Sequence, residues 1–164
     1  MSLTVLHSQF AYKAWANAEL YAFLTQQEQG PLLQTALRTL NHIYVVDKIF
    51  QAHLCGQPHP YTFANTDDTP GVADLSWQVH ECDAWFITHV SSLTAAQLAE
   101  PVRFIFTDGD KGQMSREEIL LHVLLHGSYH RGNVGQLFKS VNIAPPRDLY
   151  TKFLHQLEPG RRDH

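Results

Sequence analysis

The apolar residues of the chain follow a helical repeat in four long segments. In the first of them, Phe10, Ala14, Leu20 and Leu24 lie at helical spacings. Glycine and proline interrupt the pattern between segments, because neither continues a helix well, and Gly30 followed by Pro31 is the strongest such signal. The predicted helices run from about Ser2 to Gln29, from Pro31 to Cys55, from Asp74 as N-cap to Val90, and from Ser115 as N-cap to Val141.

The connections between these helices differ in character. A polar stretch over residues 57–72 holds three prolines and a glycine, and a loop of that length in a compact domain often packs over a site. After a last helical turn near residues 94–100, alternation over 102–106 and 112–114 around an Asp-Gly turn predicts a hairpin. A short final helix is expected over 147–157. We therefore predict one all-α domain over residues 1–164, an up-and-down four-helix bundle with a small β-hairpin between helices 3 and 4 and a short C-terminal helix.

Charge and composition exclude several classes of function. The 164 residues carry a formal net charge of −4, which argues against a nucleic-acid groove or a surface for anionic membranes. No apolar run approaches the roughly 20 residues of a membrane span, and the N-terminus does not resemble a signal peptide. Two cysteines form neither a disulfide framework nor a zinc-ribbon pattern. We expect a soluble cytoplasmic protein that binds neither nucleic acid nor membrane.

Histidine is unusually frequent: the chain has 11 histidines against 12 lysines and arginines together. Three of them recur at intervals of four residues in the last long helix. We measure the direction of each side chain as an angle around the helix axis, with Ile119 at zero and about 100° per residue. Val123, Val134 and Leu137 then lie at about 40°, 60° and 0°, and these apolar residues predict the core-facing stripe of the helix. On the same scale His126 and His130 lie at about −20° and +20°, within that stripe, and His122 lies at its edge near −60°.

Two imidazoles on a buried stripe need partners for their ring nitrogens. An unpaired buried polar group costs about 1–3 kcal/mol, and a divalent metal between rings four residues apart removes that cost. Hydrogen-bonded core histidines are the alternative. A third ligand could come from His42, which also lies on an apolar stripe of the second helix. His53 shares that face but lies about 16 Å away along the axis, and the facing of His80 is less clear.

Several motifs together resemble the DinB/YfiT-like superfamily of metal-binding four-helix bundles. The matching strings are Tyr12–Leu20, Leu40–Ile43 with Val46–Asp47, Leu125–Asn133 and Ala144–Leu149, within a resemblance that covers about Leu3 to Leu157. The resemblance implies a three-histidine site of His42, His126 and His130, and it gives His122 no ligand position. The chain departs from the family pattern in two places: Phe50 stands where a tryptophan is common and Asn133 where a glutamine is common.

Three neutral imidazoles leave coordination positions open, which is the pattern of catalytic rather than structural metal sites. Histidine selects weakly among divalent transition metals, and we expect zinc or nickel first. Asn133 and Tyr129 are candidates to orient the ligands or bound water. We interpret Arg131 and Asp47 as surface or interhelical contacts, and the tryptophans Trp15, Trp77 and Trp85 as core aromatics.

Three hypotheses follow. By resemblance, the protein is a metal-dependent enzyme that activates a thiol or water, similar to a thiol S-transferase or a hydrolase, with a small-molecule substrate such as a low-molecular-weight thiol. The alternative is a metal-binding stress or damage-response protein without turnover. The third is a helical bundle whose histidines serve its core alone. The resemblance also implies a homodimer.

Overall fold

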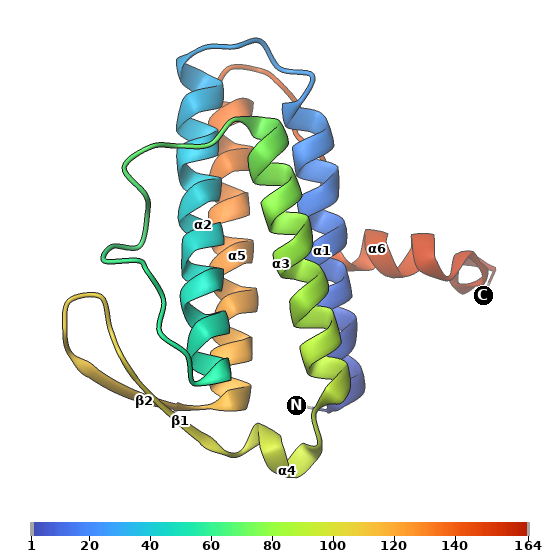
Figure 1. Ribbon diagram of the computed structural model, residues 1–164. Helices are drawn as coiled ribbons and strands as arrows, with labels where there is room; N and C mark the ends of the chain where they lie inside the picture. Colours follow the sequence, from blue (N-terminus) through green and yellow to red (C-terminus); the bar gives the residue numbers. More distant parts are fainter. Residues whose placement is uncertain (1, 164) are drawn as a thin grey trace.

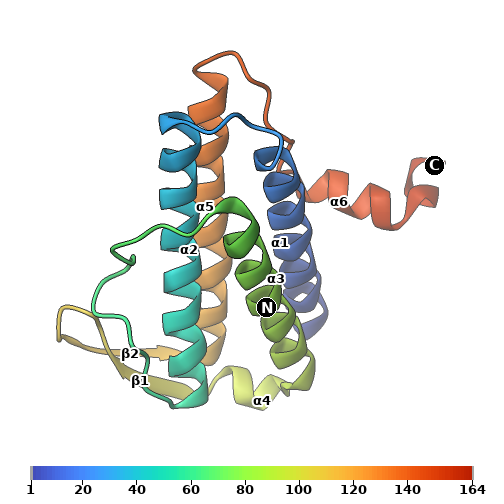
Figure 2. The same cartoon turned by 45° about the horizontal axis from the view of Figure 1, so that its top comes forward.

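The computed structural model describes residues 2–163 and shows four long helices lying side by side (Figure 1). The elements are α1 (Leu3–Leu24), α2 (Pro31–Cys55), α3 (Val72–Ser92), α4 (Ala95–Leu98), β1 (Pro101–Ile105), β2 (Lys111–Ser115), α5 (Arg116–Lys139), α6 (Tyr150–Leu157) and a final 3-10 turn (Pro159–Arg162). Within the bundle, α1 packs mainly against α3, and α2 mainly against α5. The fold is the predicted all-α bundle with a two-stranded hairpin and a short C-terminal helix, and α6 projects from its side (Figures 1 and 2).

Local chemistry sets several helix ends close to the predicted ones, although α1 ends at Leu24 rather than at the predicted Gln29. The hydroxyl of Ser115 accepts a hydrogen bond from the Glu118 amide at 3.2 Å, and the Glu118 carboxylate accepts from the Ser115 amide at 2.6 Å, which is the predicted capping box. Gly56 ends α2 at φ +63°, a left-handed conformation that favours glycine. The third helix differs from prediction, because Gly71 is its N-cap and Asp74 lies inside the first turn. There a carboxylate still interacts favourably with the helix dipole.

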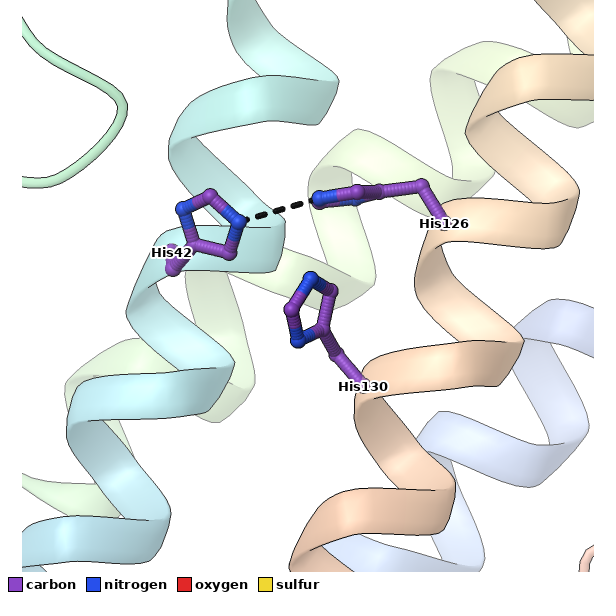
Figure 3. Close-up of side chains that lie close together, drawn as sticks. All are labelled: His42, His126 and His130. Atoms are coloured by element: carbon purple, nitrogen blue, oxygen red, sulfur yellow. Dashed lines mark hydrogen bonds between the residues drawn. The ribbon is translucent and has the colours of Figure 1, made fainter.

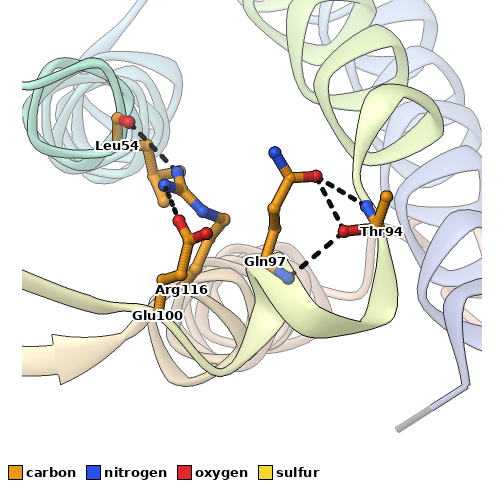
Figure 4. A network of polar contacts seen from close by, with 5 residues as sticks. All are labelled: Leu54, Thr94, Gln97, Glu100 and Arg116. Atoms are coloured by element: carbon orange, nitrogen blue, oxygen red, sulfur yellow. Dashed lines mark hydrogen bonds and ion pairs between the residues drawn. The ribbon is translucent and has the colours of Figure 1, made fainter.

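The hairpin follows α4 in the chain and packs beside α2 and the start of α5 near one end of the bundle (Figure 1). Its strands pair antiparallel from Pro101 opposite Ser115 to Ile105 opposite Lys111. Arg116, at the start of α5, donates to the Leu54 carbonyl of α2 at 3.1 Å and pairs with Glu100 at 3.4 Å (Figure 4). These contacts connect the end of α2 to the segment that leads into α5. They hold the two helices that carry the candidate site in a common register.

The apolar core is divided into two clusters along the bundle axis. The cluster near the hairpin includes Leu6, Phe10, Phe50, Phe86, Ile119 and Val123. The cluster at the opposite end includes Leu24, Leu33, Leu37, Leu75, Val134 and Phe138. Along the helices, polar residues occur between the positions that belong to the two clusters, and several of them are as deeply buried as the apolar ones. A layer of charge therefore lies between two apolar clusters.

Lys13 is at the centre of this charged layer and is only 1% exposed. Its Nζ lies 2.8 Å from a carboxylate oxygen of Asp47 on α2 and also contacts the carboxylate of Asp83 on α3. Asn17, one turn further along α1, donates to the other oxygen of Asp83 at 2.7 Å. Burial lowers the pKa of Lys13, but the two carboxylates outweigh this effect and hold the pKa above its usual range. Lys13 therefore joins three helices as a cation.

Arg131 on α5 is also buried, at 4% exposure. Its Nε donates to the Asp148 carboxylate at 2.8 Å, and Asp148 also accepts from the Tyr12 hydroxyl. A Cβ at Gly127 would lie 3.3 Å from Arg131 Nη1 and 3.6 Å from Lys13 Cε, so a glycine makes room for both cations. Arg131 thus forms an ion pair with the segment before α6 from a buried position, rather than from the surface.

The tryptophans are not all core residues. Trp77 is 66% exposed, which contradicts the prediction. It lies two residues after buried Leu75, and two residues turn a helix by about 200°, so its side chain emerges on the opposite face. Trp15 and Trp85 are half-buried, and the ring of Trp15 packs 5.8 Å from that of Phe153 on α6. Within the described residues, no helix is long and apolar enough to cross a membrane.

Candidate metal centre

Three histidines from two helices converge between α2 and α5 (Figure 3). His42 comes from α2, and His126 and His130 come from consecutive turns of α5. One ring nitrogen from each lies within 4.8 Å of the others. Nε2 of His126 is 3.0 Å from Nε2 of His42, and the ring centroids of His126 and His130 are 4.5 Å apart. The structure therefore places together the three residues that the sequence singled out as candidate ligands.

The backbone fixes which nitrogen of His42 faces this cluster. Nδ1 of His42 lies 2.6 Å from the carbonyl oxygen of Ala64. A carbonyl oxygen only accepts hydrogen bonds, so Nδ1 of the neutral ring carries the proton and Nε2 keeps its lone pair. That lone pair is directed at His126. Metal-binding histidines are commonly held by such a bond from the other ring nitrogen.

The carbonyl of Ala64 belongs to the α2–α3 loop (residues 57–71), which crosses α2 beside the cluster. Two α2 residues just before His42 hold this loop in place. The Asn41 amide donates to Thr66 Oγ1 at 2.7 Å and to Asn65 Oδ1, and the Arg38 guanidinium donates to the Thr66 carbonyl. Asn41 is 1% exposed, so its own two bonds are partly shielded from water. The loop is therefore anchored directly beside the carbonyl that orients His42.

Replacing Asn41 by alanine is expected to weaken metal binding without removing a ligand. Loss of its two bonds loosens the segment that holds the Ala64 carbonyl against His42, and loss of such an outer partner typically costs 10- to 100-fold in metal affinity. We expect the dissociation constant to rise by about tenfold, measured by competition with a chelator. Thr39→Ala is the matched control, since in the described part of the chain Thr39 Oγ1 bonds only the Thr35 carbonyl of its own helix, at 3.2 Å. Equal effects of both substitutions would contradict the role of Asn41.

The cluster favours uncharged imidazoles. Burial lowers the pKa of His126 to about 3, with further lowering from the neighbouring His130, His42 and His122 and from Lys13. Burial and His42 also lower the pKa of His130. Neutral rings present lone pairs to a cation, whereas imidazolium rings would repel it. The surroundings therefore favour the protonation state that a metal requires.

The pKa of His126 gives the metal-free protein a specific pH dependence. The unfolded chain protonates this histidine below pH 6.5, but the folded chain resists until the pH nears 3. The stability gained from the neutral ring is thus complete above pH 6.5 and is lost as the pH falls toward 3. Metal-free His126→Gln should lose less unfolding free energy than wild type between neutral pH and pH 5, measured by urea denaturation. His80→Gln, at an exposed position on α3, should follow wild type.

The nitrogen separations suit a small divalent cation. A tetrahedral zinc site with Zn–N bonds of 2.0–2.1 Å places its ligand nitrogens about 3.3 Å apart. The 3.0 Å between the Nε2 atoms of His42 and His126 is close to that value. The other nitrogen pairs of the cluster lie within 4.8 Å, so small side-chain rotations would bring them to the same separation. Nδ1 of His126 is buried without a hydrogen-bond partner among the described residues. The donor set of three imidazoles fits zinc, nickel or another divalent transition metal.

Other histidines lie outside this cluster. His122 stacks on His126 with ring centroids 5.5 Å apart, but it is not part of the group that could share an ion. His53 stacks on Phe104 at 4.7 Å, and His80 is exposed on α3. These placements agree with the expectations that His53 lies too far from His42 and that His122 is not a ligand, and they put His80, whose facing the sequence left open, outside the group.

The two candidate orienting residues lie differently. Tyr129 is 68% exposed, and its ring centroid is 5.0 Å from that of His130. Asn133 is exposed, and within residues 2–163 no hydrogen bond joins it to the cluster. Their roles stay predictions.

The buried side of α5 differs in orientation from the predicted stripe. Its fully buried residues include Leu120, Gly127, Arg131 and Phe138, which lie near 80–120° on the scale that puts Ile119 at zero. The true centre of the buried face is therefore rotated away from His126 and His130. Both histidines lie at its border beside α2 and are half-buried, which leaves part of the cluster accessible.

Sequence reasoning missed the buried polar groups near the centre. Lys13 and Asn17 lie one turn apart on the face of α1 that also carries Phe10 and Leu20, and this pattern could have marked them as buried. Asp47 was interpreted as a helix–helix contact, and its ion pair with Lys13 confirms this. The Ala64 carbonyl has no signal in the sequence, because any residue supplies one.

Comparison with known proteins identifies the family of the chain. None of the curated proteins compared with the chain matches it. A family model described as "DinB family" matches residues 6–161, which is nearly the whole length. The match includes both helices that carry the histidine cluster. The chain therefore belongs to the DinB family.

Proposed function

We propose that His42, His126 and His130 bind one divalent transition metal ion, zinc or nickel first, and that the protein uses this ion to activate a thiol or water. The observation that carries the proposal is the convergence of three imidazole nitrogens within 4.8 Å. Among the described residues no fourth histidine, cysteine or carboxylate joins the group. Three protein ligands with an open position are typical of catalytic metal sites.

The residues around the site have distinct tasks in this proposal. A divalent ion held there lowers the pKa of a coordinated water or thiol, which supplies a nucleophile near neutral pH. His42 offers Nε2 because the Ala64 carbonyl holds the proton on Nδ1. Burial keeps His126 neutral, and Lys13 disfavours its protonation further. The reaction class that fits is thiol S-transfer or hydrolysis, with a small-molecule substrate such as a low-molecular-weight thiol.

The test begins with protein purified without a histidine tag. We expect elemental analysis to find about one transition metal ion per chain after dialysis. The loaded protein should then accelerate transfer of a small thiol to an activated chloroarene, and chelator-treated protein should not. If the protein binds one ion per chain but accelerates neither thiol transfer nor ester hydrolysis, the proposed activity is wrong and the alternative, a metal-binding protein without turnover, is supported. Absence of stoichiometric metal, even after incubation with zinc or nickel, would refute the site.

A further inference from the structure

The three histidines of the cluster are half-buried and lie at the border of the buried face of α5. The neighbouring α5 residues Val123 and Gly127 are buried, and in Figure 3 α3 passes behind the three rings while α1 lies behind α5. On the helical scale used above, His122 and Tyr129 lie near −60° and −80°, on the flank away from the core. Both side chains therefore border the half-buried histidines on the side of α5 away from the core.

Two aromatic rings stand on this flank, one beside each α5 histidine of the cluster. The ring centroid of Tyr129 is 5.0 Å from that of His130, and the ring of His122 lies 5.5 Å from that of His126. His122 is backed in turn by Phe50, whose ring centroid is 4.9 Å away. Seven residues separate His122 from Tyr129, which is about 10.5 Å along the helix, with His126 between them.

Two cations near the cluster already have partners in the part of the chain that the structure describes. Arg38, one turn before His42, is engaged with carbonyls of the α2–α3 loop. Lys13 lies on the inward side and is paired with Asp47 and Asp83. A carboxylate, sulfonate or phosphate on the ligand would therefore lose water and would have to compete with these partners for a cation.

We propose that the flank of Tyr129 and His122 selects metal-bound ligands that carry an uncharged aromatic group next to the coordinating atom, so that the preferred thiols and acceptors are aryl or arylalkyl compounds. This inference rests on the proposed metal site and names the substrate class of that site. The contact is that of one ring against another, edge to face or offset. Such contacts are worth about 2- to 12-fold in affinity per ring pair.

The experiment compares three thiols of similar acidity on cobalt-loaded protein, whose visible spectrum reports thiolate binding. Phenylethanethiol carries a phenyl ring, mercaptoethanol a hydroxyl group and mercaptoethanesulfonate an anion. We expect phenylethanethiol to bind about tenfold more tightly than mercaptoethanol, and the sulfonate to gain nothing from its charge. Bound cobalt is measured first in every sample. Failure to load cobalt would count against the metal site, whereas full loading without a preference for the phenyl compound would overturn only the present inference.

Variants of Tyr129 make the result specific. Tyr129→Ala should reduce the phenyl preference several-fold, and Tyr129→Phe should retain it because the ring remains. Trp77→Ala is the matched control: Trp77 is 66% exposed, close to the 68% of Tyr129, but lies on α3 away from the cluster. His122→Ala provides a second variant on the other side of His126. An unchanged preference in both Tyr129→Ala and His122→Ala would overturn the proposal.

Discussion

Replacing Lys13 by methionine is expected to lower the free energy of unfolding by about 3–5 kcal/mol, since breaking a buried ion pair from one side leaves unpaired charge. Asp47 and Asp83 would lose their shared cation while remaining 2% and 3% exposed. Methionine is similar in length and flexibility, so a cavity contributes little of the effect. Urea denaturation of the metal-free protein, with Lys13→Met beside wild type, measures the difference.

Two further proteins separate charge from packing at this position. Lys48→Met on α2 is the matched control, because Lys48 is half-buried and, among residues 2–163, its Nζ bonds only Gln51, at 2.6 Å. We expect it to change stability by less than about 1 kcal/mol. Combining Lys13→Met with Asp47→Asn and Asp83→Asn removes the unpaired charges and should recover part of the loss. A Lys13→Met protein as stable as Lys48→Met would show that the charged layer does not depend on this cation.

Bound metal is expected to fall far below one ion per chain in His126→Ala and in His130→Ala. Each substitution removes one of three nitrogens that lie within 4.8 Å of one another, and two remaining imidazoles hold an ion weakly. Loss of an outer partner alone costs 10- to 100-fold in affinity, so loss of a ligand should cost at least about 100-fold. Elemental analysis after dialysis, and competition with a chelator, give the stoichiometry and the affinity.

His122→Ala is the comparison for these variants, because His122 stacks on His126 without belonging to the cluster. It should keep about one ion per chain. Circular dichroism checks that each variant is helical, since an unfolded protein would also lose its metal. Unchanged metal content in both His126→Ala and His130→Ala would refute the site, and loss in His122→Ala alone would move it by one turn along α5.

The sequence predicted the helices well because the helical repeat and its breakers are local signals. Gly30–Pro31, Gly56 and the capping box of Ser115 and Glu118 act within a few residues of the boundaries they set. The start of α3 was predicted too late, because Asp74 is favourable both as an N-cap and within the first turn. The dipeptide before it, Pro70–Gly71, was the better signal.

The histidine cluster was predictable to the extent that its members repeat along one helix. His126 and His130 are four residues apart, and His42 came from the family resemblance and its apolar neighbours. The rotation of the buried face toward Gly127 and Arg131 was not predictable, because a pattern on one helix does not show its partners. Arg131 is tolerated in a buried position because it pairs with Asp148, and Lys13 because it pairs with carboxylates on two other helices. Such pairing is a property of the assembled bundle.

The bond between His42 and the Ala64 carbonyl has a consequence for the motion of the polypeptide. Because the same contact holds the ring and the α2–α3 loop, occupancy of the site and ordering of residues 57–71 are linked by one coupling free energy. If order in the loop strengthens binding of the ion by some factor, the bound ion stabilises the ordered loop by the same factor, because coupling between two sites is reciprocal. Amide exchange and proteolytic cleavage in residues 57–71 should slow by that factor when the ion binds. The loop, already anchored through Asn41 and Arg38, is therefore expected to be less accessible to proteases in the metal-loaded protein than in the metal-free one.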